Sequence, residues 1–172
     1  MQTIQNNNII VIDIPQGCSR HQFVKERIDD LKEQFELAPN KITILRSGKK
    51  KLGSVYLNIT YAGNRAFLLM TTYRCGIDAE QVRQLDASKR NTLSKWMRKP
   101  VPDDLAFFKQ WTKLESTVKY YDDKELFDGL NGQIAYSGLT TCYETFEDII
   151  IAITCDENKT KTPRSFIKYG NI

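Results

Sequence analysis

Apolar and polar positions along the first third of the chain predict a strand followed by a helix. The run "IIVIDIP" (9–15) is typical of a short strand ended by proline. Ser19 can cap a helix through about residue 35, because apolar residues then recur on one side. Those apolar residues are Phe23, Ile28, Leu31 and Phe35.

Residues 41–80 are typical of strands. The segment "KITILRSGKKKLG" predicts a strand followed by a basic turn bounded by glycine. The segment "SVYLNITYAGNRAFLLMTTYRCGIDAE" predicts two or three strands, with a turn at Ala62-Gly63-Asn64.

After Asp86 the pattern becomes helical. The segment "LDASKRNTLSKWM" predicts one helix, which "KPVP" interrupts, and Asp103 or Asp104 can start the next. Apolar residues of this second helix recur at helical spacing, which predicts a stripe buried in the core. They are Phe107, Trp111, Leu114, Val118 and Tyr121.

The last third predicts strands at "GQIAYSGL", "TTCYETF" and "DIIIAITC", with an added edge strand in the tail "KTKTPRSFIKYG". Both parts of the chain then run from a helix into strands that end in an apolar strand. The class expected is α+β. The order suggests an internal duplication, with an N-terminal half at 1–85 and a C-terminal half at 86–172.

Composition narrows the functional classes only a little. The 172 residues are 41% hydrophobic and 27% charged, which is typical of a globular protein, and the net charge of +4 weakly favours an acidic partner. A single histidine and no CxxC motif argue against a zinc site or a Ser/His or Cys/His nucleophile. With no signal peptide and no apolar run of membrane-spanning length, we expect a cytoplasmic monomer that does not bind a membrane.

The stretch "WTKLESTVKYY" can be either an ordinary solvent-facing helix or part of a metal and phosphate site. Glu115 and Lys119 lie one helical turn apart, and the ordinary interpretation is a solvent-facing pair worth roughly 0.3–0.5 kcal/mol. Asp78 and Glu80 lie two apart on an expected strand, so their carboxylates share a face. They can also simply end a hairpin. Together with Glu115 they offer three oxygen ligands of the kind that Mg²⁺ prefers.

The two blocks together resemble the 4′-phosphopantetheinyl transferases of the longer, surfactin-synthetase-activating type. Their pattern is roughly G-(I/V)-D-x-E, then W-(S/T)-x-K-E-(A/S)-x-x-K, and "GIDAE" and "WTKLESTVK" match most of it. Upstream, "GKKKLGSVYLNITYAG" is similar to the family segment G-K-P … N-(I/L)-S-H-(S/A)-G. The match spans about Gly48 to Lys119.

The resemblance implies two similar halves, each a helix on a small antiparallel sheet, with coenzyme A and Mg²⁺ in the cleft between them. It implies transfer of the phosphopantetheine arm from coenzyme A to a serine of an acidic acyl or peptidyl carrier protein, releasing 3′,5′-ADP. Asp78, Glu80 and Glu115 would hold Mg²⁺, and Lys119 would contact a phosphate. Glu115, or a metal-bound water beside it, would take the serine proton.

Coenzyme A contacts in the N-terminal half are implied at Lys49 and Thr60. Lys49 can equally be part of a solvated "KKK" turn, and Thr60 can simply pack. Tyr61 stands where the family has histidine, and Leu114 stands where it has lysine. The family's phenylalanine-rich segment between the two blocks is not evident in "KRNTLSKWMRKP". Arg20 and Arg46 are candidates for the adenosine 3′-phosphate that the spacing does not distinguish.

Two alternatives remain open beside the transferase. The departures at Tyr61 and Leu114 are compatible with a non-catalytic relative that binds coenzyme A or a carrier protein. The net charge and the "GKKK" turn are compatible with a small nucleic-acid-binding module, which we rank last because no binding motif accompanies them.

Overall fold

The computed structural model describes residues 8–34, 42–44, 50–52, 55–97, 99–159 and 165–169. The strands are β1 (Asn8–Asp13), β2 (Ile42–Ile44), β3 (Lys50–Leu52), β4 (Val55–Ala62), β5 (Arg65–Thr71), β6 (Cys75–Gln81), β7 (Leu139–Phe146), β8 (Ile149–Asp156) and β9 (Ser165–Lys168). The helices are α1 (Arg20–Gln34), α2 (Ala87–Met97), α3 (Asp104–Tyr121) and α4 (Leu126–Leu130), with a 3₁₀ turn at Glu157–Lys159.

The larger sheet, sheet A, has the strand order β2-β3-β4-β5-β1-β9. Its neighbours are antiparallel except β1 and β9, which run parallel. Helix α1 covers one face, where Val24, Ile28 and Leu31 pack with Ile10 and other buried side chains of the sheet. The alternation of β1 therefore divides its residues between two cores, one on each face.

The smaller sheet, sheet B, has the strand order β6-β8-β7 and is antiparallel throughout. Its inner face packs on sheet A, where Phe67 and Leu69 meet Ile77 and Ile151 in one buried cluster. The outer face of β6 and β8 is covered by α3. Burial on both faces explains why β8 is an uninterrupted apolar run rather than an alternating one.

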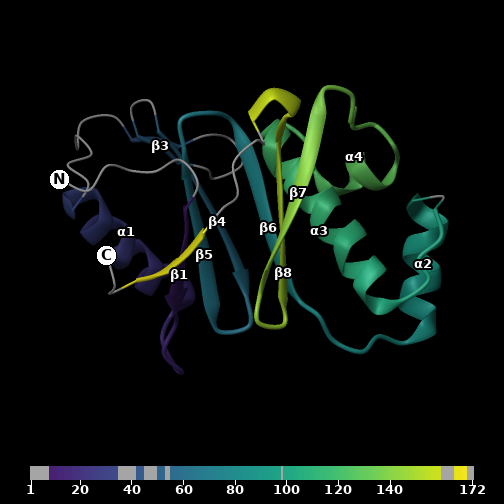
Figure 1. The fold of residues 1–172 in the computed structure, drawn as a ribbon, viewed down its shortest axis with the longest axis horizontal. Coiled ribbons are helices and arrows are strands. Elements are labelled where there is room, and N and C mark those ends of the chain that lie inside the picture. The colour runs from purple at the N-terminus through teal and green to yellow at the C-terminus, as the bar shows by residue number, and fades with distance from the viewer. Residues whose placement is uncertain are drawn as a thin grey trace.

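The elements form successive layers from α1 through sheet A and sheet B to α3, with α2 and α4 beside α3 (Figure 1). The two sheets also meet along an edge, where β4 lies beside β6. There the Ala79 backbone N–H donates to Thr60 Oγ1 over 3.2 Å. The strand that carries Asp78 and Glu80 is thus held between β4 and α3.

Most predicted elements are confirmed. The turn at residues 62–64 joins β4 to β5, and the tail contributes the edge strand β9. The expected basic turn between Gly48 and Gly53 is wrong at Lys50–Leu52, which form strand β3, while the rest of that turn and the expected helix end at Phe35 lie outside the described residues. The strand expected at "GQIAYSGL" is wrong, because residues 132–138 form turns and only Leu139 begins a strand.

The predicted core stripe of the second helix is also largely wrong. Of its five apolar residues only Leu114 is buried, and the face of α3 on sheet B consists mainly of small or hydroxyl side chains. The buried residues of α3 are Phe108, Thr112, Leu114, Ser116, Thr117 and Tyr120. Small side chains let α3 approach sheet B closely. The face of α3 that lies on the sheet is therefore the one with small side chains, not the most hydrophobic one.

The α+β class is as expected, with antiparallel sheets and helices on their outer faces. Two strands cross the expected boundary at residues 85 and 86, because β6 belongs to sheet B and β9 to sheet A. The internal duplication and this boundary therefore stay predictions. Among the described residues, no helix has both the length and the apolar character needed to span a membrane.

Candidate functional site

The N-terminal cap of helix α3 and its close packing on β6 place Glu115 and Lys119 beside the acids of that strand. Asp103 caps the helix by accepting a hydrogen bond from the Ala106 N–H over 2.7 Å. One turn before its end, the helix lies directly on Gly76. A Cβ on Gly76 would lie 1.9 Å from the Ser116 carbonyl oxygen and 2.6 Å from the Tyr120 nitrogen. Only glycine permits this approach.

Buried hydroxyl groups hold the same part of α3 to the sheet. Thr154 on β8 lies 2.8 Å from the Ser116 hydroxyl and 2.9 Å from that of Thr141 on β7. Thr117 adds a contact of 3.4 Å to Thr154. Ser116, Thr117 and Thr154 are buried, and the cluster fixes the position of α3 along the sheet, and thus the position of the residues between Ser116 and Tyr120.

Asp78 and Lys119 form the centre of the site. The Lys119 ammonium donates to Asp78 Oδ1 over 2.6 Å, and Thr60 Oγ1 donates to the same oxygen over 3.2 Å. Asp78 is only 4% exposed. Its second oxygen, Oδ2, is buried and has no hydrogen-bond partner among the described residues. Burial raises the pKa of Asp78, and the charge of Lys119 opposes that rise.

Glu115 lies beside this pair, with its Oε2 4.0 Å from the Lys119 nitrogen. Burial raises the pKa of Glu115 to about 7, and the negative charge of Asp78 adds to the rise. The Lys119 charge and a hydrogen bond from Trp111 act in the opposite direction. A carboxyl group in this state exchanges its proton near neutral pH, which is the property of a general base or acid.

Glu80 completes the acidic group on the same face of β6. Burial raises the pKa of Glu80, while a hydrogen bond from Arg83, 3.4 Å away, lowers it. Asp78 and Glu115 are each in contact with Lys119, and the charges of Asp78 and Glu80 both act on Glu115. Asp78 and Glu115 therefore meet at Lys119, whereas Glu80 acts on Glu115 through its charge, and the convergence of all three acids on one ion stays a prediction.

Three carboxylates with one ammonium leave an excess of negative charge that a cation would neutralise. The donor atoms are all oxygens, and Asp78 Oδ2 has no partner, so the residues fit a hard divalent ion such as Mg²⁺ in chemistry and charge. As placed, no three acidic, cysteine or histidine side chains of the described residues surround a common point as metal ligands. Lys119 instead neutralises Asp78 directly. The metal site at Asp78, Glu80 and Glu115 stays a prediction.

Of the residues expected to contact coenzyme A in the N-terminal half, the structure describes some and not others. Lys49 and Arg46 lie outside the described residues. Thr60 is buried, and its hydroxyl both donates to Asp78 and accepts from the Ala79 N–H. It acts on the site by positioning Asp78, and its contact with coenzyme A stays a prediction.

Tyr61 points to the opposite face of sheet A from Thr60, because neighbours on a strand alternate. It packs against the α1 face, where His21 meets its ring edge at a centroid distance of 5.6 Å. The Arg20 guanidinium lies 5.7 Å from the ring centroid. The start of α1 therefore places a positive charge beside Tyr61, a neighbour that the sequence alone did not single out.

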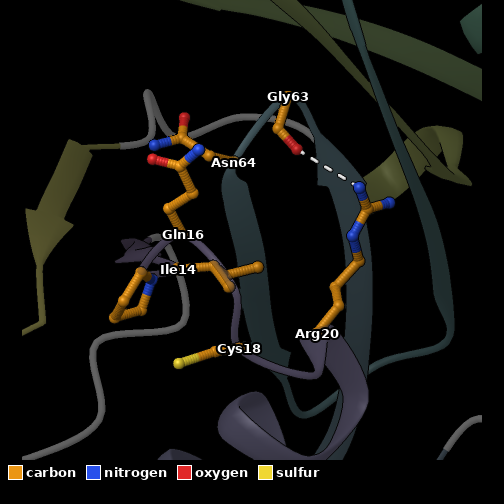
Figure 2. Close-up of a pocket in the computed structure, with 7 residues that line it drawn as sticks. Ile14, Gln16, Cys18, Arg20, Gly63 and Asn64 are labelled. Carbon is orange, nitrogen blue, oxygen red and sulfur yellow. Dashed lines mark hydrogen bonds between the residues drawn. The ribbon is translucent and has the colours of Figure 1, made fainter.

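Arg20 also lines a pocket of about 360 Å³ at the start of α1, where it donates to the Gly63 carbonyl oxygen over 3.5 Å (Figure 2). The side-chain amides of Gln16 and Asn64 lie across the pocket from Arg20 (Figure 2). None of the three acids of the site lines this pocket. It is therefore separate from the acidic group on β6 and α3.

The departure at Leu114 has a packing reason. Leu114 is fully buried beneath α4, where a Cβ on Gly129 would lie 2.4 Å from Leu114 Cδ1. A side chain at this position points away from the acids. The ammonium of the neighbouring Lys113 lies 5.5 Å from the ring centroid of Tyr136.

Trp111 lies one helical turn from Glu115 and also lines a second pocket. It stacks on Phe107 at a centroid distance of 6.3 Å, and both rings line a pocket of about 320 Å³ between α2 and α3. Trp96, which is 52% exposed, lines the same pocket. The expectation that Trp111 is core is therefore wrong, because its side chain is only half-buried and borders this pocket.

Comparison with models of known protein families and with curated proteins finds no match.

Proposed function

We propose that this protein transfers the 4′-phosphopantetheine arm of coenzyme A to a serine of a carrier protein in a Mg²⁺-dependent reaction. The observation that carries the proposal is the meeting of Asp78 and Glu80 from β6 with Glu115 and Lys119 from α3. These residues are distant in sequence and lie in the two blocks that resemble the transferase pattern.

Glu115 is the residue best suited to take the serine proton. With no metal bound, its pKa of about 7 leaves a large share of the carboxylate ionised at neutral pH, yet basic enough to accept a proton. The serine oxygen forms a bond to the β-phosphorus as the bond from that phosphorus to the bridging oxygen breaks. The proton moves to the Glu115 carboxylate, and 3′,5′-ADP leaves.

Lys119 and Asp78 have complementary tasks. The Lys119 ammonium lies 2.6 Å from Asp78 and 4.0 Å from Glu115, and would contact the pyrophosphate, where negative charge builds up during transfer. Asp78, Glu80 and Glu115 would hold Mg²⁺. When bound, Mg²⁺ supplies neutralisation and alignment of the phosphates, as in other phosphoryl transfers. The hydrogen bond from Thr60 would keep the Asp78 carboxylate oriented toward the metal.

The test is incubation of the protein with coenzyme A, MgCl₂ and an apo carrier protein, followed by mass spectrometry of the carrier. Several carriers of the fatty-acid and peptide types are needed. The expected result is the added mass of the arm with at least one carrier, and none when EDTA replaces MgCl₂. Failure with every carrier would contradict the proposal.

A variant pair separates chemistry from folding. Glu115→Gln should abolish transfer while the circular dichroism spectrum is unchanged. Glu26→Gln, on the exposed side of α1, is the matched control and should transfer normally. A second readout is the rise in melting temperature on adding MgCl₂, which Glu115→Gln should reduce. Normal transfer and a normal MgCl₂ effect in Glu115→Gln would remove the proposed site.

One observation favours a second candidate, a non-catalytic protein that binds coenzyme A or a carrier protein. The Lys119 ammonium lies 2.6 Å from Asp78, so this carboxylate has a cationic partner of its own. Under this alternative, coenzyme A binding measured by calorimetry would be unaffected by EDTA and no carrier would gain mass. The nucleic-acid alternative would require binding of an oligonucleotide at low salt.

A further inference from the structure

The two edges of sheet B differ in how they are covered. The edge formed by β6 lies against β4 and is bridged by the bond from the Ala79 N–H to Thr60 Oγ1. The edge formed by β7 has no neighbouring strand among the described residues. β7 is eight residues long, and its sequence "LTTCYETF" contains no lysine, arginine or proline and a single charge, Glu144. Exposed edges usually carry such residues to prevent unwanted pairing.

The outward-pointing backbone groups of β7 can be assigned from the antiparallel alternation. Gly138 accepts from the Glu157 N–H, on the β8 side, whereas the Leu139 N–H turns away to Tyr136. By alternation, Thr141, Tyr143 and Thr145 direct their N–H and C=O groups away from β8. No backbone hydrogen bond from another described element reaches these three residues. The edge is therefore open to a further strand.

Two lysines of α3 border this edge. Lys109 lies 5.8 Å from the ring centroid of Tyr143, and the Tyr143 hydroxyl donates to the Lys109 carbonyl oxygen over 3.0 Å. Lys113 lies 5.5 Å from the ring centroid of Tyr136. Neither lysine makes an ion pair with a described residue. Both tyrosines are 37% exposed.

The charges select between a second copy of this chain and a different partner. If β7 paired with β7 of a second copy, the facing residues on the α3 side would be Thr141, Tyr143 and Thr145, which are uncharged. The lysines of both copies would then approach one another and repel. An incoming strand with carboxylates at alternate positions would instead place them beside Lys109 and Lys113.

We propose that the edge of β7 binds an extended acidic segment of a partner protein as an added strand. Backbone hydrogen bonds to Thr141, Tyr143 and Thr145 supply the attachment, and Lys109 and Lys113 select acidic side chains. The surface lies on the opposite edge of sheet B from Asp78 and Glu80. It is independent of the proposed transferase activity.

The experiment uses the full chain and an eight-residue peptide, as long as β7, that alternates threonine with glutamate and carries an uncharged dye. Binding is measured by fluorescence polarisation at low salt. A peptide with lysine in place of glutamate is the control. Hydrogen–deuterium exchange then locates the bound peptide, and the expected result is protection of the amides of Thr141, Tyr143 and Thr145 with the acidic peptide alone.

Two sets of variants test backbone and charge separately. Thr145→Pro removes an outward N–H without touching the bonds to β8, and should abolish peptide binding, whereas Thr145→Ala keeps the N–H and should bind normally. The double variant Lys109→Glu, Lys113→Glu should weaken binding by about tenfold, as expected for two exposed ion pairs. Circular dichroism confirms that each variant is folded, and Glu115→Gln should bind the peptide like the unmodified protein.

Several results would overturn the proposal. These are no binding of the acidic peptide at millimolar concentration, equal binding of the lysine peptide, or normal binding by folded Thr145→Pro. A dimer that forms at high protein concentration and is lost in Thr145→Pro would assign the edge to a second copy instead. Competition by a single-stranded oligonucleotide that Thr145→Pro does not affect would assign the lysines and tyrosines to nucleic acid.

Discussion

Gly76→Ala is the substitution that most directly tests how the site is built. The added Cβ would lie 1.9 Å from the Ser116 carbonyl oxygen, whereas Cβ contacts below 3.0 Å essentially do not occur. Both of its nearest neighbours, the Ser116 oxygen and the Tyr120 nitrogen, are backbone atoms. No rotamer change can therefore relieve the contact, and α3 must move away from β6 by about 1.1 Å.

A displacement of this size matters because Lys119 lies between Ser116 and Tyr120. Its ammonium lies 2.6 Å from Asp78 Oδ1, and an added 1.1 Å would leave the hydrogen-bonding range. Overpacking a core contact typically costs about 1–3 kcal/mol. In a chain of 172 residues this corresponds to a fall in melting temperature of roughly 2–12 °C.

Thermal unfolding, followed by circular dichroism with and without MgCl₂, measures both effects. Gly129→Ala is the matched control, because its Cβ would meet the movable end of the Leu114 side chain, away from the acids. We expect both variants to be less stable, but only Gly76→Ala to lose the MgCl₂ effect and carrier transfer. If Gly76→Ala kept its melting temperature and its transfer rate, close packing of α3 on Gly76 would not be what holds the site together.

Three further predictions concern the site residues. Native Glu115 keeps its proton up to about pH 7, whereas the unfolded side chain loses it near 4.5, so the unfolded state binds fewer protons between these values. The contribution of Glu115 to the free energy of unfolding therefore falls as the pH rises through this window and is constant above it. We expect Glu115→Gln to be more stable than the unmodified protein by on the order of 2 kcal/mol at pH 8, and equally stable at pH 4. Urea unfolding without metal measures both values. Thr60→Val should destabilise by about 1–3 kcal/mol in the same assay by removing a hydrogen bond to buried Asp78, while Thr60→Ser should not. Leu114→Lys introduces the lysine of the transferase pattern that the sequence resembles. It should lower the melting temperature by several degrees without raising transfer, because position 114 is buried against Gly129. A gain in transfer would show that this position faces the substrate.

Local patterns determined much of the fold from the sequence. Proline at 100 and 102 with Asp103 gave the start of α3, and "AGN" gave the turn between β4 and β5. The weak strand in the tail was also predictable, since "SFIK" is apolar enough to pair with β1. These features depend on residues close in sequence, so no knowledge of the fold is needed.

The candidate site was accessible to sequence reasoning only as a set of residue types. Asp78 and Glu80 share a face because strands alternate, and Glu115 and Lys119 share a face because helices turn every 3.6 residues. That these two faces meet depends on Gly76 and on the hydroxyl groups around Thr154. A single glycine or threonine in a sequence does not form a pattern from which such a contact between helix and sheet can be predicted.

The sequence by itself therefore determined most of the elements and which side chains share a face, the acids of β6 on one and Glu115 with Lys119 on another, because spacing along the chain fixes these features. The tertiary structure decided which faces are buried. It placed serine and threonine rather than the apolar stripe of α3 against sheet B, turned Leu114 under α4, and brought Arg20 beside Tyr61. The physical reason is that burial and pKa depend on what approaches a residue from elsewhere in the chain, and that distance is set only when helix and sheet pack together.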